Sequence, residues 1–320
     1  VQTSLKFKML ALGNKHSCGI SKQDKLYCWG SDAEKQLGSW GGDQKTPTQV
    51  ESGSGRPSTY QTVTAGKTHT CGLATSGKAY CWGEGTNGRI GDGSTSTAYV
   101  PEAVSGGHTF TDLAAGWDNF ACGVTSGGSI YCWGKNESGQ LGNGMSGSGN
   151  QQTSPVKASS AQSFDAIAAG DEHACALTTA GTPYCWGNNS EGALGLGHRN
   201  DKSTPTSLGA TLSFQSIVAG GGPSSALNDG FTCALDSSGK AKCWGENYNR
   251  TLGDGTSSDR ITPTSVNGGH SFDQIDAGLG HVCASTSAGA VYCWGRNGSD
   301  ELDGASTQGH QATPAQVPCF

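Results

Sequence analysis

The chain has 320 residues and a formal net charge of −6, with 52 glycines, 33% hydrophobic residues and only 14% charged residues. Disordered chains combine few aromatic residues with high net charge, whereas this one carries 8 Trp, 8 Tyr and 8 Phe, which excludes disorder. Mild acidity without clustered Lys and Arg excludes a nucleic-acid-binding surface. No apolar stretch approaches the ~20 residues of a membrane-spanning helix, so we expect no membrane span.

A Cys-Trp-Gly step recurs six times and divides the chain into repeats of about 50 residues. The spacings between successive Trp residues are 53, 51, 53, 58 and 50. A period of this length indicates a repeat architecture. The six repeats run from Phe7 to Val317 and fill the chain, and their tryptophans are Trp29, Trp82, Trp133, Trp186, Trp244 and Trp294.

Each repeat predicts four short strands in a fixed order. The first has the pattern Phe-x-x-Ile-x-Ala-Gly, as in residues 164–170, with Tyr60 replacing the Phe in the second repeat. The second strand carries a Cys, the third ends in Cys-Trp-Gly, and a polar Gly-rich loop leads to a fourth strand at a step such as Thr262-Pro263. Four strands per repeat without helical periodicity are typical of a propeller blade.

The first and last repeats have the same pattern as the middle ones. Solenoid arrays need polar capping repeats at their ends, so a closed ring is favoured over an open array. We therefore predict one all-β domain over residues 1–320, a closed β-propeller of six four-stranded blades with one hairpin disulfide per blade. The sequence leaves open whether the strand near Thr313 completes the first blade or the last.

Twelve of the 13 cysteines form six pairs with a constant separation of ten residues. If Cys71 faces Cys81 in a hairpin, Ala74 faces Lys78, and the third residue of the remaining three-residue loop needs a positive φ. Glycine stands at that position in five repeats and Asp24 in the first. Opposed residues have Cα atoms ~4.5–5.5 Å apart, which suits a disulfide. The predicted bridges are Cys18–Cys28, Cys71–Cys81, Cys122–Cys132, Cys175–Cys185, Cys233–Cys243 and Cys283–Cys293.

Metal binding is the competing interpretation of these cysteines. Two Cys on one hairpin make only half a zinc site, so we favour disulfides and expect no metal. Disulfides indicate an oxidising compartment, and we expect a secreted protein. The start Val1-Gln2-Thr3, without Met, indicates a processed N-terminus. Cys319 is left over, either as an interchain bridge or free thiol, or as a tail residue without a role.

The repeats resemble the regulator-of-chromosome-condensation repeat. The matching text in the fourth unit is His173-x-Cys-Ala-Leu177, Gly181, Trp186-Gly187-Asn188 and Gly192-Ala193-Leu194-Gly195, and similar text recurs in every unit. The resemblance implies a propeller, but it does not fix a function. Family members include an exchange factor for a small GTPase, a plant UV-B receptor, β-lactamase inhibitors and invertebrate carotenoproteins. The familiar members have seven blades and lack the paired cysteines, which argues against a nuclear or cytosolic role.

One position, two residues before the first Cys of each pair, is filled only by His or Phe. Four equivalent histidines could be metal ligands on a common face, but a position that accepts Phe as well is typical of packing. We therefore expect these imidazoles to be hydrogen-bonded to backbone, and the repeated Trp residues to fill the space between adjacent blades. The six residues are His16, His69, Phe120, His173, Phe231 and His281.

Aromatic residues outside the repeat pattern are the candidates for ligand contact. Trp40 lies in the loop after the first Trp-Gly, and Trp117 lies in a turn after an inner strand. Between Gly220 and Cys233 the fifth repeat has twelve residues where others have four or five, which predicts a recognition loop. Local packing and a tolerated insertion are the competing interpretations. The predicted ligand-binding residues are Trp40, Trp117, Phe120, Leu227, Phe231 and Tyr248.

Four Asn-x-Ser/Thr sequences are candidate glycosylation sites, and in three of them the Asn follows Trp-Gly in the turn, which can be incidental to the repeat. They lie at Asn136, Asn188, Asn249 and Asn297. No nucleophile elbow, metalloprotease helix or phosphate loop occurs in a fitting context. We therefore expect no catalytic residues, no catalytic cofactor and no enzyme activity.

Two functions remain in competition. The first is binding of an apolar small molecule, and the family resemblance makes this ligand a carotenoid, held in a dry slot that a homo- or hetero-dimer interface can provide. The second is a protein-binding inhibitor or lectin-like propeller with exposed Tyr and Trp on a polar face. An absorption spectrum of native protein separates the two.

Overall fold

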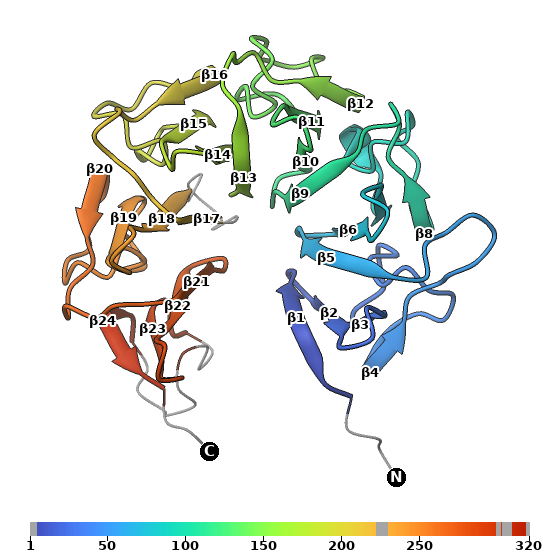
Figure 1. The fold of residues 1–320 in the computed structure, drawn as a ribbon, viewed down its shortest axis with the longest axis horizontal. Coiled ribbons are helices and arrows are strands. Elements are labelled where there is room, and N and C mark those ends of the chain that lie inside the picture. Colours follow the sequence, from blue (N-terminus) through green and yellow to red (C-terminus); the bar gives the residue numbers. More distant parts are fainter. Residues whose placement is uncertain (1–4, 222–229, 299–301, 303–308, 318–320) are drawn as a thin grey trace. The chain divides into compact units, whose positions relative to one another are not determined.

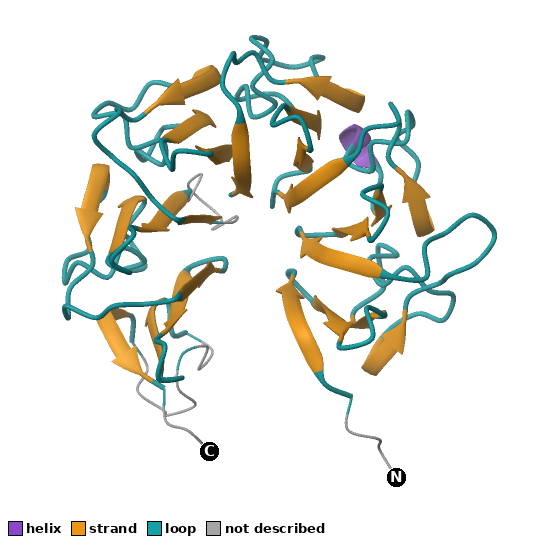
Figure 2. Ribbon diagram, in the orientation of Figure 1, coloured by secondary structure: helices purple, strands orange, loops and turns teal. Residues whose placement is uncertain are grey.

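The computed structural model describes residues 5–221, 230–298, 302 and 309–317, which are almost entirely strand and loop (Figure 2). The strands form six four-stranded antiparallel sheets, one for each repeat (Figure 1). The prediction of an all-β propeller with six four-stranded blades is confirmed. The described part of the chain contains no helix that is long and apolar enough to cross a membrane.

The strands of each blade follow one another in chain order. Blade 1 consists of β1 (Phe7–Leu12), β2 (His16–Ser21), β3 (Leu26–Gly30) and β4 (Gln44–Gln49). Blade 2 consists of β5 (Tyr60–Ala65), β6 (His69–Ala74), β7 (Ala79–Gly83) and β8 (Ala98–Ala103), with the short 3-10 turn η1 (Thr86–Gly88). Blade 3 consists of β9 (Phe110–Ala115), β10 (Phe120–Thr125), β11 (Ile130–Gly134) and β12 (Gln152–Lys157).

The remaining three blades have the same plan. Blade 4 consists of β13 (Phe164–Ala169), β14 (His173–Thr178), β15 (Pro183–Gly187) and β16 (Lys202–Ser207). Blade 5 consists of β17 (Ser216–Gly220), β18 (Phe231–Leu235), β19 (Ala241–Gly245) and β20 (Arg260–Ser265). Blade 6 consists of β21 (Gln274–Ala277), β22 (His281–Ser285), β23 (Val291–Gly295) and β24 (Gln311–Gln316).

The chain divides into two compact units. Residues 1–137 and 141–167 hold blades 1 to 3 and the first four residues of β13, and residues 138–140 and 168–320 hold the rest of blades 4 to 6. Strand β24 pairs with β23, with Tyr292 opposite Gln316. The strand at Thr313 therefore completes the last blade, which answers the question that the sequence left open.

The second and third strands of every blade form the predicted hairpin. Cys71 lies directly opposite Cys81, the Ala74 N–H donates to the Lys78 carbonyl, and Gly77 has a φ of +80°. In blade 1 Asp24 takes the positive-φ position with a φ of +63°. All six predicted disulfides are present, with Cα–Cα distances of 4.0 to 4.1 Å. Six such bridges indicate a protein of a non-reducing compartment.

Five of the repeated tryptophans are fully buried, and each indole N–H donates to a loop carbonyl seven residues after the preceding Trp. Trp82 shows the arrangement: its Nε1 lies 3.0 Å from the Gln36 oxygen, and Gly38, with a φ of +67°, packs against the ring where a Cβ would clash. Trp29 has no preceding blade in its unit and is partly exposed. The other donor–acceptor pairs are Trp133–Arg89, Trp186–Gln140, Trp244–Ala193 and Trp294–Thr251, each at 2.9 Å.

Candidate binding surface

The most exposed tryptophan among the described residues stacks on a tyrosine of the next blade. Trp40 lies in the β3–β4 loop and Tyr99 on β8, and their ring centroids are 5.5 Å apart with 18° between the ring planes. Trp40 is 70% exposed and Tyr99 is 46% exposed. The ammonium of Lys35 lies 5.7 Å from the Tyr99 ring centroid, within cation–π range. The pair is a fixed aromatic surface that faces solvent.

Neither aromatic belongs to the repeat. Where blade 1 has Trp40, blades 2 to 5 have glycine and blade 6 has alanine, and where blade 2 has Tyr99, other blades have Lys, Thr, Ser, Ile or Ala. At those junctions the glycine N–H donates to the carbonyl of the facing outer-strand residue, so folding does not require an aromatic side chain there. The hydrogen-bonded pairs are Gly93–Thr153, Gly197–Ile261 and Gly255–Ala312, at 2.9, 2.8 and 2.9 Å.

The other predicted ligand-binding residues do not join this surface. Phe120 and Phe231 are 0% exposed and pack against Gly116 and Gly220 at the ends of the inner strands, so they are core residues and we no longer assign them to ligand contact. Trp117 is 7% exposed and is also largely buried. Tyr248 is 73% exposed on the β19–β20 loop. Leu227 and most of the predicted recognition loop lie outside the described residues.

Sequence analysis missed Tyr99. The signal was available, because an aromatic at a place where other repeats have Lys45, Thr153, Ser203, Ile261 or Ala312 is as far from the pattern as Trp40. Comparing the residues at this position across all repeats, and not residue type alone, would have identified Tyr99.

The histidines serve packing, as predicted, but their partner is a side chain. The Nε2 of His16 lies 2.8 Å from the Thr70 hydroxyl of the next blade, and that of His173 lies 2.9 Å from the Thr232 hydroxyl. Burial lowers the pKa of both imidazoles to about 4, so they are neutral at physiological pH. His69 is fully buried as well, and no side chain forms a hydrogen bond with its ring.

Two of the four candidate glycosylation sites are inaccessible in the folded chain. Asn136 is 1% exposed and Asn297 is 3% exposed. Each side-chain oxygen accepts the N–H of a leucine five residues further on, Leu141 and Leu302, at 3.1 Å. The prediction of glycans on Asn136 and Asn297 is therefore wrong for the folded state. Asn188 and Asn249 are half-buried.

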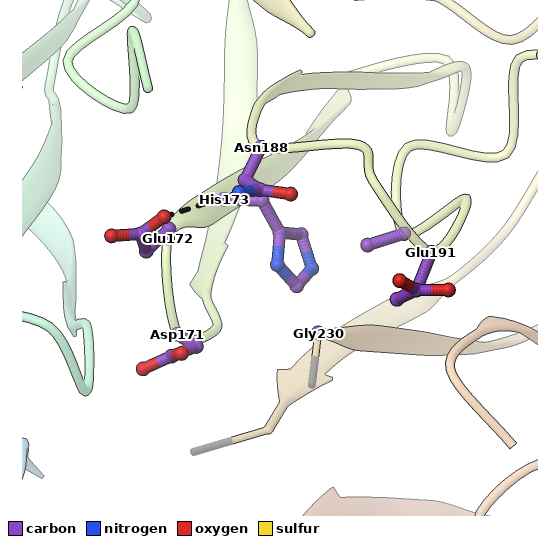
Figure 3. A pocket seen from close by; sticks show the side chains of 7 residues that line it. Asp171, Glu172, His173, Asn188, Glu191 and Gly230 are labelled. Carbon is purple, nitrogen blue, oxygen red and sulfur yellow. Dashed lines mark hydrogen bonds between the residues drawn. The ribbon is translucent and has the colours of Figure 1, made fainter. Parts of the chain in front are cut away.

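A small pocket opens at the start of β14 (Figure 3). Glu172 accepts hydrogen bonds from Asn188 at 3.1 Å and from Ser138 at 2.9 Å, while the His173 ring is held by Thr232. Glu172 and His173 are therefore both held by hydrogen bonds within the chain. Over the described residues, no three His, Cys, Asp or Glu side chains gather in a metal-binding arrangement. The residues that line the pocket are Asp171, Glu172, His173, Asn188, Glu191, Ala193 and Gly230.

Four-stranded blades in tandem, each joined to its neighbour by a Trp–carbonyl hydrogen bond, define a repeat-built β-propeller. Residues 1–319 match the model of the RCC1-like domain, and the chain belongs to this family. The resemblance found in the sequence is thereby confirmed.

Relatives of known name differ widely in what they do. The chain is 30% identical over 199 residues to the ultraviolet-B receptor UVR8 of Arabidopsis thaliana, covering 61% of this chain and 43% of that protein, so it spans less than half of this relative. The crystal structure of human WBSCR16 superimposes with a TM-score of 0.84 at 20% identity, covering 100% of this chain and 83% of that one. The structure of yeast RCC1 (Prp20), crystallised with Kap60, superimposes with a TM-score of 0.84 at 20% identity, covering 98% of this chain and 75% of that one. These two structures establish the fold alone.

Proposed function

We propose that this chain is a non-catalytic binding protein that works outside the reducing cytosol and holds a protein partner on the Trp40–Tyr99 pair. The observation that carries the proposal is the exposure of two stacked aromatics at a junction where other blades use a backbone hydrogen bond. Because the repeat does not need these side chains to fold, their exposure calls for another explanation, and partner contact supplies one.

The chemistry of the pair supports a protein partner. Trp and Tyr are the residues that most often dominate protein–protein binding energy, because they offer a large contact area with few rotatable bonds. The stack on Tyr99 already restricts Trp40, so little side-chain entropy remains to be lost on binding. RCC1 of yeast, which has the same fold, was crystallised with the protein Kap60.

The six disulfides support the compartment. Cytosolic proteins rarely keep structural disulfides, whereas extracellular ones often depend on them. We therefore propose that the protein is secreted or displayed outside the cell.

The test compares variants of the oxidised recombinant protein in capture from extracellular fluid of the source. Trp40→Ala and Tyr99→Ala should each lower the affinity for the captured protein by a factor of about 10 to 100. Tyr248→Ala, which removes an equally exposed but unstacked aromatic, is the matched control and should bind like the wild type. Unchanged binding in the Trp40 and Tyr99 variants would contradict the proposal, and binding only on a glycan array would favour the lectin-like alternative. Turnover of generic ester or glycoside substrates would contradict the non-catalytic part.

Carotenoid binding stays a prediction from the family resemblance. Three of the five described aromatics predicted to contact such a ligand, Trp117, Phe120 and Phe231, are buried in the blades. A visible absorption band in protein purified from its source would support a pigment, and a colourless preparation without extractable lipid would contradict it.

A further inference from the structure

The loop that follows Trp29 differs from its counterparts in one buried side chain. Three residues after the repeated Trp, four blades have Asn and blade 1 has Asp32. In all five loops one side-chain oxygen accepts the N–H of a leucine five residues on, and for Asp32 the distance from Leu37 N to Oδ1 is 3.1 Å. The other pairs are Asn136–Leu141, Asn189–Leu194, Asn247–Leu252 and Asn297–Leu302, at 3.0 to 3.1 Å.

The second atom of the side chain faces acceptors. The Asn189 amide donates to the carbonyls of His198 and Asn200, at 2.7 and 3.1 Å. The Asn247 amide donates to the carbonyl of Ser258 at 3.0 Å. The turn before the outer strand thus directs oxygens at this atom, which suits an N–H donor.

Asp32 offers an oxygen at the place of that donor. The residue is 2% exposed, and its Oδ2 is buried without a hydrogen-bond partner. A second carboxylate lies beside it, because Asp43 Oδ1 accepts the Asp32 N–H at 2.7 Å. In blades 4 and 5 the residue at the place of Asp43 is also Asp, but there it accompanies a neutral Asn. In blade 1 alone among these three, the residue three positions after the Trp and the residue at the place of Asp43 are both carboxylates.

The nearest cation of the chain does not complete the site. The Lys35 ammonium is 3.7 Å from Asp32 Oδ2, beyond hydrogen-bonding distance, and its side chain is 31% exposed. A buried carboxylate oxygen without a hydrogen-bond donor is costly. Asp32 Oδ2 therefore has one partly exposed ion-pair partner, Lys35, and no hydrogen-bond donor.

We propose that the blade 1 loop binds Ca²⁺ between Asp32, Asp43 and the backbone oxygens of the turn at residues 39–43. Carboxylates and carbonyls are the oxygen ligands that Ca²⁺ prefers, and its flexible coordination suits a turn better than the strict octahedron of Mg²⁺ does. Ser39, which takes the place of Asn143 and Asp254 in blades 3 and 5, adds a hydroxyl oxygen. Lys35 is the internal competitor that the ion displaces.

Ca²⁺ binding does not require the proposed partner, although the turn includes Trp40 and Lys35 lies over the Tyr99 ring. With two carboxylates and a competing lysine, we expect a dissociation constant of about 0.1–1 mM, the range of extracellular calcium modules. Most of the proposed ligands are backbone oxygens, so the site contains only two acidic side chains.

The experiment measures thermal unfolding and Tb³⁺ luminescence of the oxidised protein. In 10 mM CaCl₂ the wild type should melt about 2–4 °C higher than in EDTA. Tb³⁺, which occupies calcium sites, should give sensitised emission that Ca²⁺ removes by competition. Asp32→Asn introduces the residue that blades 3 to 6 have at this position. This variant should show neither the rise in melting temperature with Ca²⁺ nor the Tb³⁺ emission. In EDTA it should melt at or above the wild-type temperature, because the amide supplies the missing donor. Asp236→Asn, in a hairpin turn of blade 5, should keep both responses.

The variant Lys35→Met distinguishes neutralisation of Asp32 by a bound Ca²⁺ from neutralisation by the Lys35 ammonium. If the ion binds, this variant should bind Ca²⁺ more tightly than the wild type. If Lys35 alone balances the charge, the variant melts lower in EDTA and the wild type does not respond to Ca²⁺. That result, or a calcium response retained by Asp32→Asn, would overturn the proposal.

Discussion

The imidazole Nε2 of His16 lies 2.8 Å from the hydroxyl of Thr70 on the next blade. The Thr70 hydroxyl donates its one proton to the Gln36 carbonyl at 2.8 Å, so it accepts from His16, and the imidazole carries its proton on Nε2. The same chain joins His173, Thr232 and the Ala193 carbonyl. His and Thr therefore act as a pair across a blade junction.

Between blades 2 and 3 this pair is incomplete, and we predict that Ala121→Thr stabilises the protein. Ala121 stands where Thr70 and Thr232 stand, so the His69 ring faces no hydroxyl and has no side-chain hydrogen-bond partner. A hydroxyl at position 121 should accept from His69 and donate to the Arg89 carbonyl, as at the sister junctions. The free energy of unfolding in urea should rise by about 1–3 kcal/mol.

Ala121→Val is the matched control for this substitution. It adds nearly the same volume without a hydroxyl, so it should give no gain or a small loss from overpacking. If Ala121→Val raised the free energy of unfolding as much as Ala121→Thr does, the effect would come from packing, and the hydrogen-bond explanation would be contradicted.

The buried histidines predict a loss of stability in acid. Burial lowers the pKa of His16 and His173 from 6.5 to about 4, so the unfolded chain binds protons first as the pH falls. The free energy of unfolding should be highest above pH 6.5 and should decline between pH 6.5 and 4. Asp112 acts in the opposite direction, because burial raises its pKa to about 6 and the folded carboxyl takes up its proton first.

Urea titrations at several pH values check this dependence. The variant His16→Phe/His173→Phe, which copies the Phe of blades 3 and 5, should show a shallower decline than the wild type. His198→Gln, a change at a partly exposed histidine, should keep the wild-type slope. An equally steep decline in the double variant would mean that other groups set the acid sensitivity.

The hairpin disulfides predict a redox-dependent stability. Cys233→Ala/Cys243→Ala removes one bridge whose partners are ten residues apart, and it should lower the free energy of unfolding by roughly 2–3 kcal/mol in the chain-entropy model. Unfolding in guanidinium, with and without a reducing agent, measures the effect. The reductant should lower wild-type stability by more than one bridge does, and a wild type indifferent to reduction would show that the bridges do not stabilise the fold.

The blades were predictable from the sequence because one local pattern repeats. The ten-residue cysteine spacing fixes the register of each hairpin, and the residue at the place of Gly77 fixes the turn, so the Cys71–Cys81 bridge follows from local chemistry. The binding surface was harder to predict from the sequence. Trp40 and Trp117 both lie outside the repeat pattern, yet Trp40 is exposed and Trp117 is buried. That difference depends on what the neighbouring blade presents, and Tyr99, 59 positions further along the chain, is not visible from the local sequence around Trp40. Phe120 and Phe231 were predictable as core residues from their His-equivalent positions.

The buried asparagines make a prediction about modification of the native protein. Asn136 and Asn297 use their side-chain oxygens to hold Leu141 and Leu302, and the Asn136 amide also donates to the Met145 carbonyl at 3.1 Å. A glycan on either nitrogen would have to break this loop and enter the core, so peptides containing Asn136 and Asn297 should be unmodified. Asn249 lies on the exposed β19–β20 loop beside Tyr248 and is the better acceptor. Enzymatic deglycosylation in ¹⁸O water followed by peptide mass analysis marks each occupied asparagine, and full occupancy at Asn136 would show that this loop does not adopt the described fold in the native protein.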